Sequence, residues 1–177
     1  MEKAAEFKGY LQVYTGNGKG KTTAALGLAL RAMGAGFRVF LGQFLKSGDF
    51  SEIKALKSFG DQIEIRQFGK GCFVRGRPSE EDVALAKEGW KSCQEALFSG
   101  NFQLLIFDEL NLALYFDLLS LEEVLSPLRK RPLSSEVVIT GRYAPEALIE
   151  MADLVTEMKE VKHYYRKGVR ARVGIEK

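Results

Sequence analysis

The stretch of the chain best suited to chemistry is a run of eight residues that mixes glycine with basic and polar side chains. It comprises Thr15–Thr22 and reads TGNGKGKT. A loop that wraps a polyphosphate turns several backbone N–H groups inward, and this needs positive φ angles that glycine adopts readily. The last lysine can reach phosphate oxygens, and the last threonine hydroxyl can ligate a divalent metal. The run is therefore typical of a phosphate-binding loop.

One position departs from the usual pattern, which opens with glycine where this chain has Thr15. A glycine-rich turn without a ligand is the alternative interpretation. The expected strand before the run and the expected helix after it favour the phosphate loop, because the helix start adds its positive dipole end to the site. The residues expected to contact a nucleotide here are Gly16, Asn17, Gly18, Lys19, Gly20, Lys21, Thr22 and Thr23.

A second polar site is expected where the apolar stretch Gln103–Phe107 ends in Asp108 and Glu109. Carboxylates beside a phosphate loop are suited to Mg²⁺ or Mn²⁺, since Mg²⁺ takes oxygen ligands and usually only one or two carboxylates. Thr22, Asp108 and Glu109 are the expected metal-site residues, provided that their two strands are neighbours. The alternative is a pair of acidic residues that caps a helix at the end of a strand.

These motifs need a scaffold, and the pattern of the chain predicts one of alternating strands and helices. Such alternation predicts βαβ units, a mostly parallel sheet with helices on both faces, and thus a single-domain α/β fold like those of P-loop NTPases and RecA. We expect a short extension over residues 1–8 and one domain over residues 9–177. The expected strands are Tyr10–Tyr14, Phe37–Gly42, Ile63–Phe68, Gln103–Phe107, Glu136–Thr140, Leu154–Met158 and Val169–Gly174. The expected helices are Lys21–Ala35, Ser51–Phe59, Ser79–Leu97, Leu121–Arg129 and Pro145–Met151.

Composition excludes several classes of function. Lys and Arg number 26 against 23 Asp and Glu, and a net charge of +3 gives no support to nucleic-acid binding. No apolar run reaches the roughly 18 residues that span a bilayer. The two cysteines, Cys72 and Cys93, match no zinc or disulfide pattern, so we expect reduced thiols and a cytoplasmic protein. The basic stretch from Lys159 to Arg172 is either a solvated edge or a contact surface for an anionic ligand.

Several motifs, taken in their order along the chain, resemble those of a known enzyme family, the P-loop corrinoid adenosyltransferases that act on cob(I)alamin and cob(I)yrinic acid a,c-diamide. The matching segments run from residue 9 to 177 and include Thr15–Thr23 (TGNGKGKTT), Phe107–Glu109 (FDE), Leu121–Val124 (LEEV), Thr140–Arg142 (TGR), Ala152–Glu157 (ADLVTE) and Val161–His163 (VKH). The phosphate-loop variant and the VKH segment are more specific than a bare P-loop pattern.

The resemblance implies adenosyl transfer, in which a reduced Co(I) corrinoid attacks C5′ of ATP and triphosphate leaves. ATP lies in a reversed direction over the phosphate loop in this family. The resemblance further implies that Lys21, Thr22 and Glu109 serve catalysis, that Glu109 is the direct metal ligand, and that Arg142 belongs to the ATP site. It implies a homodimer and a transient electron donor, such as a flavodoxin or flavin reductase. For His163 we favour a structural hydrogen bond over a cobalt-ligand role.

The loop Gly69–Pro78 departs from the family pattern. Members that bind cobalamin well carry Gly-Phe-x-Trp there, and this chain has Phe73 as its single aromatic residue in the loop. We expect Phe73 to cover the lower face of the corrin. Arg75 and Arg77 can pair with carboxylates, so we expect a preference for acidic corrinoid precursors. Two other functions remain open: an ATPase or kinase with γ-phosphate chemistry, and a non-catalytic module that binds ATP.

Overall fold

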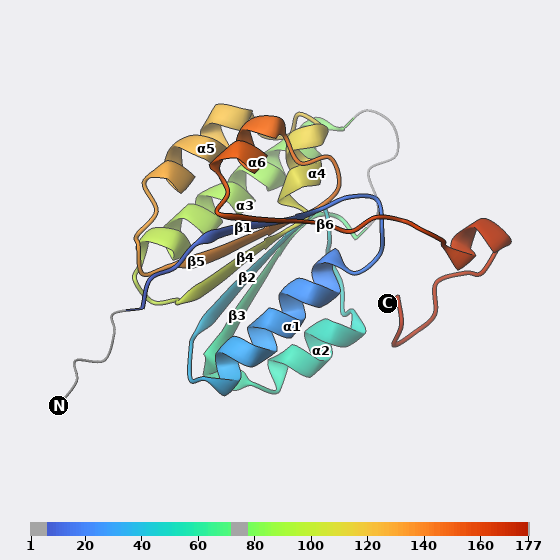
Figure 1. Ribbon diagram of the computed structural model, residues 1–177, viewed down its shortest axis with the longest axis horizontal. Helices are drawn as coiled ribbons and strands as arrows, with labels where there is room; N and C mark the ends of the chain where they lie inside the picture. Colours follow the sequence, from blue (N-terminus) through green and yellow to red (C-terminus); the bar gives the residue numbers. More distant parts are fainter. Residues whose placement is uncertain (1–6, 72–77, 177) are drawn as a thin grey trace.

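The computed structural model describes residues 7–71 and 78–176. The strands of this part of the chain form one six-stranded parallel sheet (Figure 1). The order of the strands is β3-β2-β4-β5-β1-β6, and every pairing is parallel. The strands are β1 Leu11–Thr15, β2 Val39–Phe44, β3 Ile63–Phe68, β4 Leu104–Asp108, β5 Glu136–Thr140 and β6 Leu154–Glu157. The expected α/β fold class is thus confirmed.

Helices cover both faces of this sheet (Figure 1). They are α1 Lys21–Gly34, α2 Ser51–Lys57, α3 Glu80–Phe98, α4 Leu110–Tyr115, α5 Leu121–Arg129 and α6 Glu146–Met151, with short 3₁₀ helices at Gly60–Gln62 and Tyr164–Lys167. Helices α1 and α2 lie on one face, and α3 to α6 lie on the other. Among the described residues, no helix combines the length and the apolar character needed to cross a membrane.

The central strands are apolar throughout because helices bury both of their faces. All residues of β2 and β4 are buried, and their side chains alternate between two separate core clusters. The indole ring of Trp90 on α3 packs edge-on against Phe107 at 5.6 Å between centroids. Its Nε1–H donates to the Glu123 carbonyl at 2.8 Å, so the one polar atom of the ring is satisfied.

The start of α3 follows the sequence prediction. Ser79 accepts a hydrogen bond from the backbone N–H of Asp82, and the Asp82 carboxylate accepts from the backbone N–H of Ser79. This reciprocal capping box satisfies two donors that the first turn of a helix leaves free. The helix therefore begins where the pattern of polar residues places it.

One predicted element was wrong, and one element was missed. Val169–Gly174 forms no strand but an irregular segment that ends in a turn, and Val173 is 79% exposed. The alternation of valine with arginine there is typical of a strand. The segment instead belongs to the part of the chain after β6, residues 158–176, which extends away from the sheet and is called the C-terminal arm below (Figure 1). Helix α4 was not predicted, because the segment from Leu110 to Tyr115 is too short to show helical periodicity.

Candidate active site

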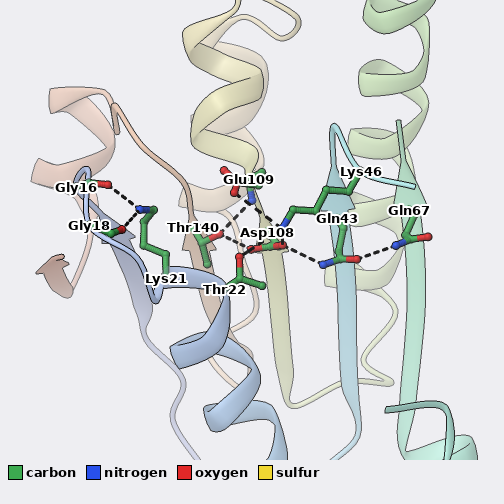
Figure 2. A network of polar contacts seen from close by, with 10 residues as sticks. All are labelled: Gly16, Gly18, Lys21, Thr22, Gln43, Lys46, Gln67, Asp108, Glu109 and Thr140. Carbon is green, nitrogen blue, oxygen red and sulfur yellow. Dashed lines mark hydrogen bonds and ion pairs between the residues drawn. The ribbon is translucent and has the colours of Figure 1, made fainter. Parts of the chain in front are cut away.

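The phosphate loop and the acidic pair meet at the carboxyl edge of the sheet. The strands that carry them do not meet the condition set above, since they are not neighbours: β5 lies between β1 and β4. Helix α1 brings them together instead: the Thr22 hydroxyl in its first turn donates to Asp108 Oδ1 at 2.8 Å (Figure 2). Ligands of open parallel sheets bind at this edge.

The loop glycines serve two different purposes. Gly16 and Gly20 have φ angles of 93° and 119°, so they supply the left-handed turns that the loop needs. Gly18 is not in that region. A Cβ atom there would lie 2.6 Å from the carbonyl oxygen of Met158, and the Gly18 N–H donates to that oxygen. Glycine is therefore required at position 18 because the loop backbone packs closely against the end of strand β6. The Gly18 N–H is not turned toward a phosphate.

The start of α1 is prepared for an anion. The residue before the helix, Gly20, has no side-chain cap, and the first turn contains no acidic residue. The Lys21 ammonium lies inside the loop and donates to the carbonyls of Gly16 and Gly18, both at 2.7 Å (Figure 2). Burial lowers the pKa of Lys21, and nearby Arg142 lowers it further. Positive charge and the amides of the first helical turn thus lie together at the loop, an arrangement suited to an anion.

Asp108 is the centre of the polar network. Its side chain is fully buried, and each carboxylate oxygen accepts two hydrogen bonds. The donors are Thr22 and Thr140 on Oδ1 at 2.8 and 2.6 Å, and Lys46 and Gln43 on Oδ2 at 2.7 and 3.0 Å (Figure 2). Burial alone would raise the pKa of Asp108, but Lys46 and these hydrogen bonds hold it below its ordinary value. Asp108 is therefore ionised and has its acceptor positions filled.

Glu109 is in the opposite situation. Its backbone has φ 60°, and its N–H donates to the Thr140 hydroxyl at 3.0 Å. The Oε2 atom is buried and has no hydrogen-bond partner among the described residues, while Oε1 lies 3.9 Å from Lys46 Nζ. Burial and then the charge of Asp108 raise the pKa of Glu109. A buried carboxylate oxygen without a partner is a ready ligand for a cation.

These oxygen atoms fit a small divalent metal. Thr22 and Glu109 offer hard oxygen atoms beside the buried Asp108 carboxylate, and Mg²⁺ prefers such donors together with water and substrate phosphate. Within the ranges 7–71 and 78–176, no group of three His, Cys, Asp or Glu side chains could hold a metal.

Other predicted nucleotide residues lie around the loop. Asn17 and Arg142 line one cavity of about 520 Å³. The ammonium of Lys19 points elsewhere and donates to the carbonyl of Ile175 at 3.1 Å, and Thr23 is exposed on α1. Phe73, together with Cys72 and the arginines of its loop, lies outside the described residues. The structure thus brings Asn17 and Arg142 together and ties Lys19 to the C-terminal arm.

His163 makes a structural hydrogen bond of the kind that we favoured. Its Nδ1 accepts a hydrogen bond from the backbone N–H of Tyr165 at 3.1 Å, and its ring packs edge-on against Tyr164 at 4.9 Å. These contacts fix the start of the 3₁₀ helix in the arm. The segment also lines a cavity of about 300 Å³ with Gly18 and Lys19, so it lies beside the phosphate loop.

Sequence reasoning missed the side chains that complete the network. Lys46 lies two residues beyond β2, and Gln43 lies within it; the amide of Gln67 on β3 donates in turn to Gln43 at 3.0 Å (Figure 2). Asn111 on α4 donates to the Gly141 carbonyl at 3.0 Å and links the ends of β4 and β5. Gln43, a polar residue within the otherwise apolar β2, was the one feature of the sequence that could have indicated a buried polar network.

Comparison with known proteins assigns this site to a family. The model of the ATP:corrinoid adenosyltransferase family BtuR/CobO/CobP matches residues 7–176. Corrinoid adenosyltransferases of Pseudomonas aeruginosa and of Escherichia coli K12 are each 37% identical over 177 residues. The alignments cover 99% of this chain and 87% and 89% of those proteins, respectively.

Among solved structures, the flagellar accessory protein FlaH of Methanocaldococcus jannaschii shares the fold. Its TM-score is 0.58 at 12% identity, over 85% of this chain and 71% of the other. That likeness shows the architecture and nothing about the reaction. The family model and the curated relatives match nearly the whole length of this chain, and the chain therefore belongs to the ATP:corrinoid adenosyltransferase family BtuR/CobO/CobP.

Proposed function

We propose that the protein transfers the 5′-deoxyadenosyl group of ATP to the Co(I) centre of a reduced corrinoid and releases triphosphate, in the formation or salvage of adenosylcobalamin. The observation that carries the proposal is the meeting of the phosphate loop with the Asp108–Glu109 pair in a member of this family. The relatives from Pseudomonas aeruginosa and Escherichia coli carry the name of that activity.

The chemistry of the transfer explains what the site contains. The electron pair of Co(I) forms the cobalt–carbon bond as the bond between C5′ and the triphosphate oxygen breaks. The leaving group is a polyanion, so the protein must stabilise its developing charge. We assign this role to Lys21, which lies inside the loop, and to the amides at the start of α1. The nucleophile is the metal of the substrate, and no protein base has to remove a proton.

We propose different roles for the two carboxylates. We propose Glu109 as the direct ligand of Mg²⁺ or Mn²⁺, together with Thr22, because Glu109 Oε2 is buried and has no partner among the described residues. Asp108 already accepts four hydrogen bonds, so it positions Thr22 and Lys46 instead. When bound, the metal would supply positive charge that stabilises the departing triphosphate.

The partners of the protein and its location in the cell are also proposals. We keep the homodimer, the flavodoxin or flavin reductase as transient electron donor, and the cytoplasm as the place of the reaction. We also keep the preference for acidic corrinoid precursors and the role of Phe73. Added salt should weaken use of an acidic corrinoid more than use of cobalamin, because screening acts on exposed charges. Equal salt sensitivity of the two substrates would remove the charge argument.

The test of this function is an anaerobic incubation with ATP, Mg²⁺ and chemically reduced cobalamin, followed by analysis of the phosphorus products. We expect triphosphate in a one-to-one ratio with a light-sensitive corrinoid. Orthophosphate or a phosphorylated product would instead indicate γ-phosphate chemistry, and tight ATP binding without turnover would indicate a binding module.

A matched pair of variants then tests the roles of the two carboxylates. Glu109→Gln should lose activity most strongly at low Mg²⁺ and regain part of it at high Mg²⁺. Asp108→Asn should lose activity at every Mg²⁺ concentration, because it disturbs the contacts that position Thr22. The reverse pattern would make Asp108 the ligand.

A further inference from the structure

A stacked pair of tyrosines lies at the carboxyl edge of the sheet, beside the site. The rings of Tyr115 and Tyr143 are 4.2 Å apart between centroids and 30° from parallel. Tyr115 ends α4, the helix that begins directly after Glu109, and Tyr143 follows β5. Both rings are about half exposed, at 53% and 51%. An exposed aromatic face of this kind offers a flat surface on which another ring can stack.

The backbone of Tyr143 adds an independent sign of function. Its φ angle is 59°, in the left-handed region that residues with a bulky side chain avoid. Glycine would hold this turn without strain, and the chain carries tyrosine there instead. Unfavourable backbone conformations of this kind gather at binding and catalytic sites. The position thus keeps an aromatic ring at a cost in conformational energy.

The cavity beside Tyr143 has the size of a nucleotide site. It has a volume of about 520 Å³. Its lining includes Asn17 of the phosphate loop, Arg142 and four further charged side chains, Glu157, Lys159, Glu160 and Arg166. Sites for small ligands have volumes in the range of about 300–1,000 Å³. A corrin with its peripheral side chains is far larger than this cavity, whereas Asn17 of the phosphate loop is part of the cavity wall. Its occupant is therefore expected to be a part of ATP.

We propose that Tyr143, held in place by Tyr115, is the surface on which the adenine ring of ATP stacks. Purines stack on aromatic side chains through their flat faces. Because Tyr143 follows the strand that lies between β1 and β4, the base would be fixed between the phosphate loop and the Glu109 end of the site. The inference rests on the proposed function only in taking ATP as the nucleotide.

The test compares binding of ATP with binding of inorganic triphosphate, measured by calorimetry in the presence of Mg²⁺. Tyr143→Gly removes the ring and suits the positive φ angle, so the variant should fold at least as stably as the natural protein. We expect on the order of a tenfold loss of ATP affinity, with triphosphate affinity unchanged. Tyr143→Phe should keep both affinities, and Tyr115→Ala should lose part of the ATP affinity.

Tyr10→Leu is the control, since Tyr10 is similarly exposed, at 45%, but precedes β1 at the opposite edge of the sheet. Unchanged ATP affinity in Tyr143→Gly would overturn the proposal. Equal losses of ATP and triphosphate affinity would also overturn it, because they would indicate a disturbed phosphate loop. A higher KM for the corrinoid with unchanged ATP affinity would assign the ring to the corrin instead. If the natural protein transfers no adenosyl group while Tyr143→Gly still loses ATP selectively, the proposed function fails and the adenine site remains.

Discussion

Replacement of Lys46 by methionine tests the buried network in isolation from catalysis. Lys46 Nζ lies 2.7 Å from Asp108 Oδ2, and the carboxylate is completely buried. Methionine keeps most of the apolar stem but leaves the carboxylate with three neutral donors. Loss of one partner of a buried ion pair costs about 3–5 kcal/mol. Because the remaining hydrogen bonds still stabilise the charge, we expect a loss of about 2–3 kcal/mol at pH 7.

The loss should depend on pH in a defined direction. Burial raises the pKa of Asp108. Lys46 and the hydrogen bonds together lower this pKa by more than burial raises it, so the net shift is downward. A lowered carboxyl pKa stabilises the protein above the ordinary carboxyl pKa, and that stability is lost as pH falls through the folded-state pKa. Without Lys46 the folded-state pKa rises, and the carboxyl is protonated earlier. The difference between Lys46→Met and the natural protein should thus shrink as the pH falls toward about 4 and below.

Urea unfolding at several pH values measures this difference. The control is Lys57→Met, which removes an exposed ion pair with Asp49 at 3.2 Å, with side chains 63% and 67% exposed. Such a pair contributes about 0–1 kcal/mol. Equal losses in the two variants would refute the reasoning, as would a loss in Lys46→Met that stays constant between pH 7 and pH 4.

Three further predictions concern packing, thiol reactivity and the loop. Gly89→Ala should lose about 1–3 kcal/mol of unfolding free energy, because its Cβ would lie 2.5 Å from the Phe68 ring. Gly27→Ala, at a position in open space on α1, should gain up to about 1 kcal/mol. Urea unfolding of both variants measures this contrast. Burial raises the pKa of the Cys93 thiol, so iodoacetamide should label it only after unfolding, as peptide mass spectrometry would show; rapid labelling of the native protein would contradict its burial. Lys21→Ala should lose most ATP binding in calorimetry, and unchanged affinity would remove the phosphate-loop assignment.

The parts of the fold that the sequence predicts are those set by local pattern. Alternating strands and helices indicated the parallel sheet, and the apolar run before Asp108 indicated a strand buried on both faces. Glycine spacing before Lys21 indicated the phosphate loop. These features depend on periodicity and on residue type within short windows, and both can be read without knowledge of distant contacts.

The parts that could not be predicted depend on contacts between distant segments. Lys46 joins the site because β2 lies next to β4, and no local pattern reveals that order. Gly18 is fixed by Met158, which lies at the far end of the chain. The C-terminal arm looked like a strand because pairing partners cannot be seen in one segment. The boundary between residues 1–8 and 9–177 stays a prediction.

The most direct test of the central claim follows the fate of C5′ of ATP. Under anaerobic conditions, ATP labelled with carbon-13 at C5′ is incubated with Mg²⁺, reduced corrinoid and the natural protein, with Lys21→Ala as control. The account predicts that the label moves to the corrinoid, where it is bonded to cobalt and released by light, and that unlabelled triphosphate appears in equal amount. Label that stays in adenosine di- or triphosphate, with a corrinoid that gains no carbon, would contradict it.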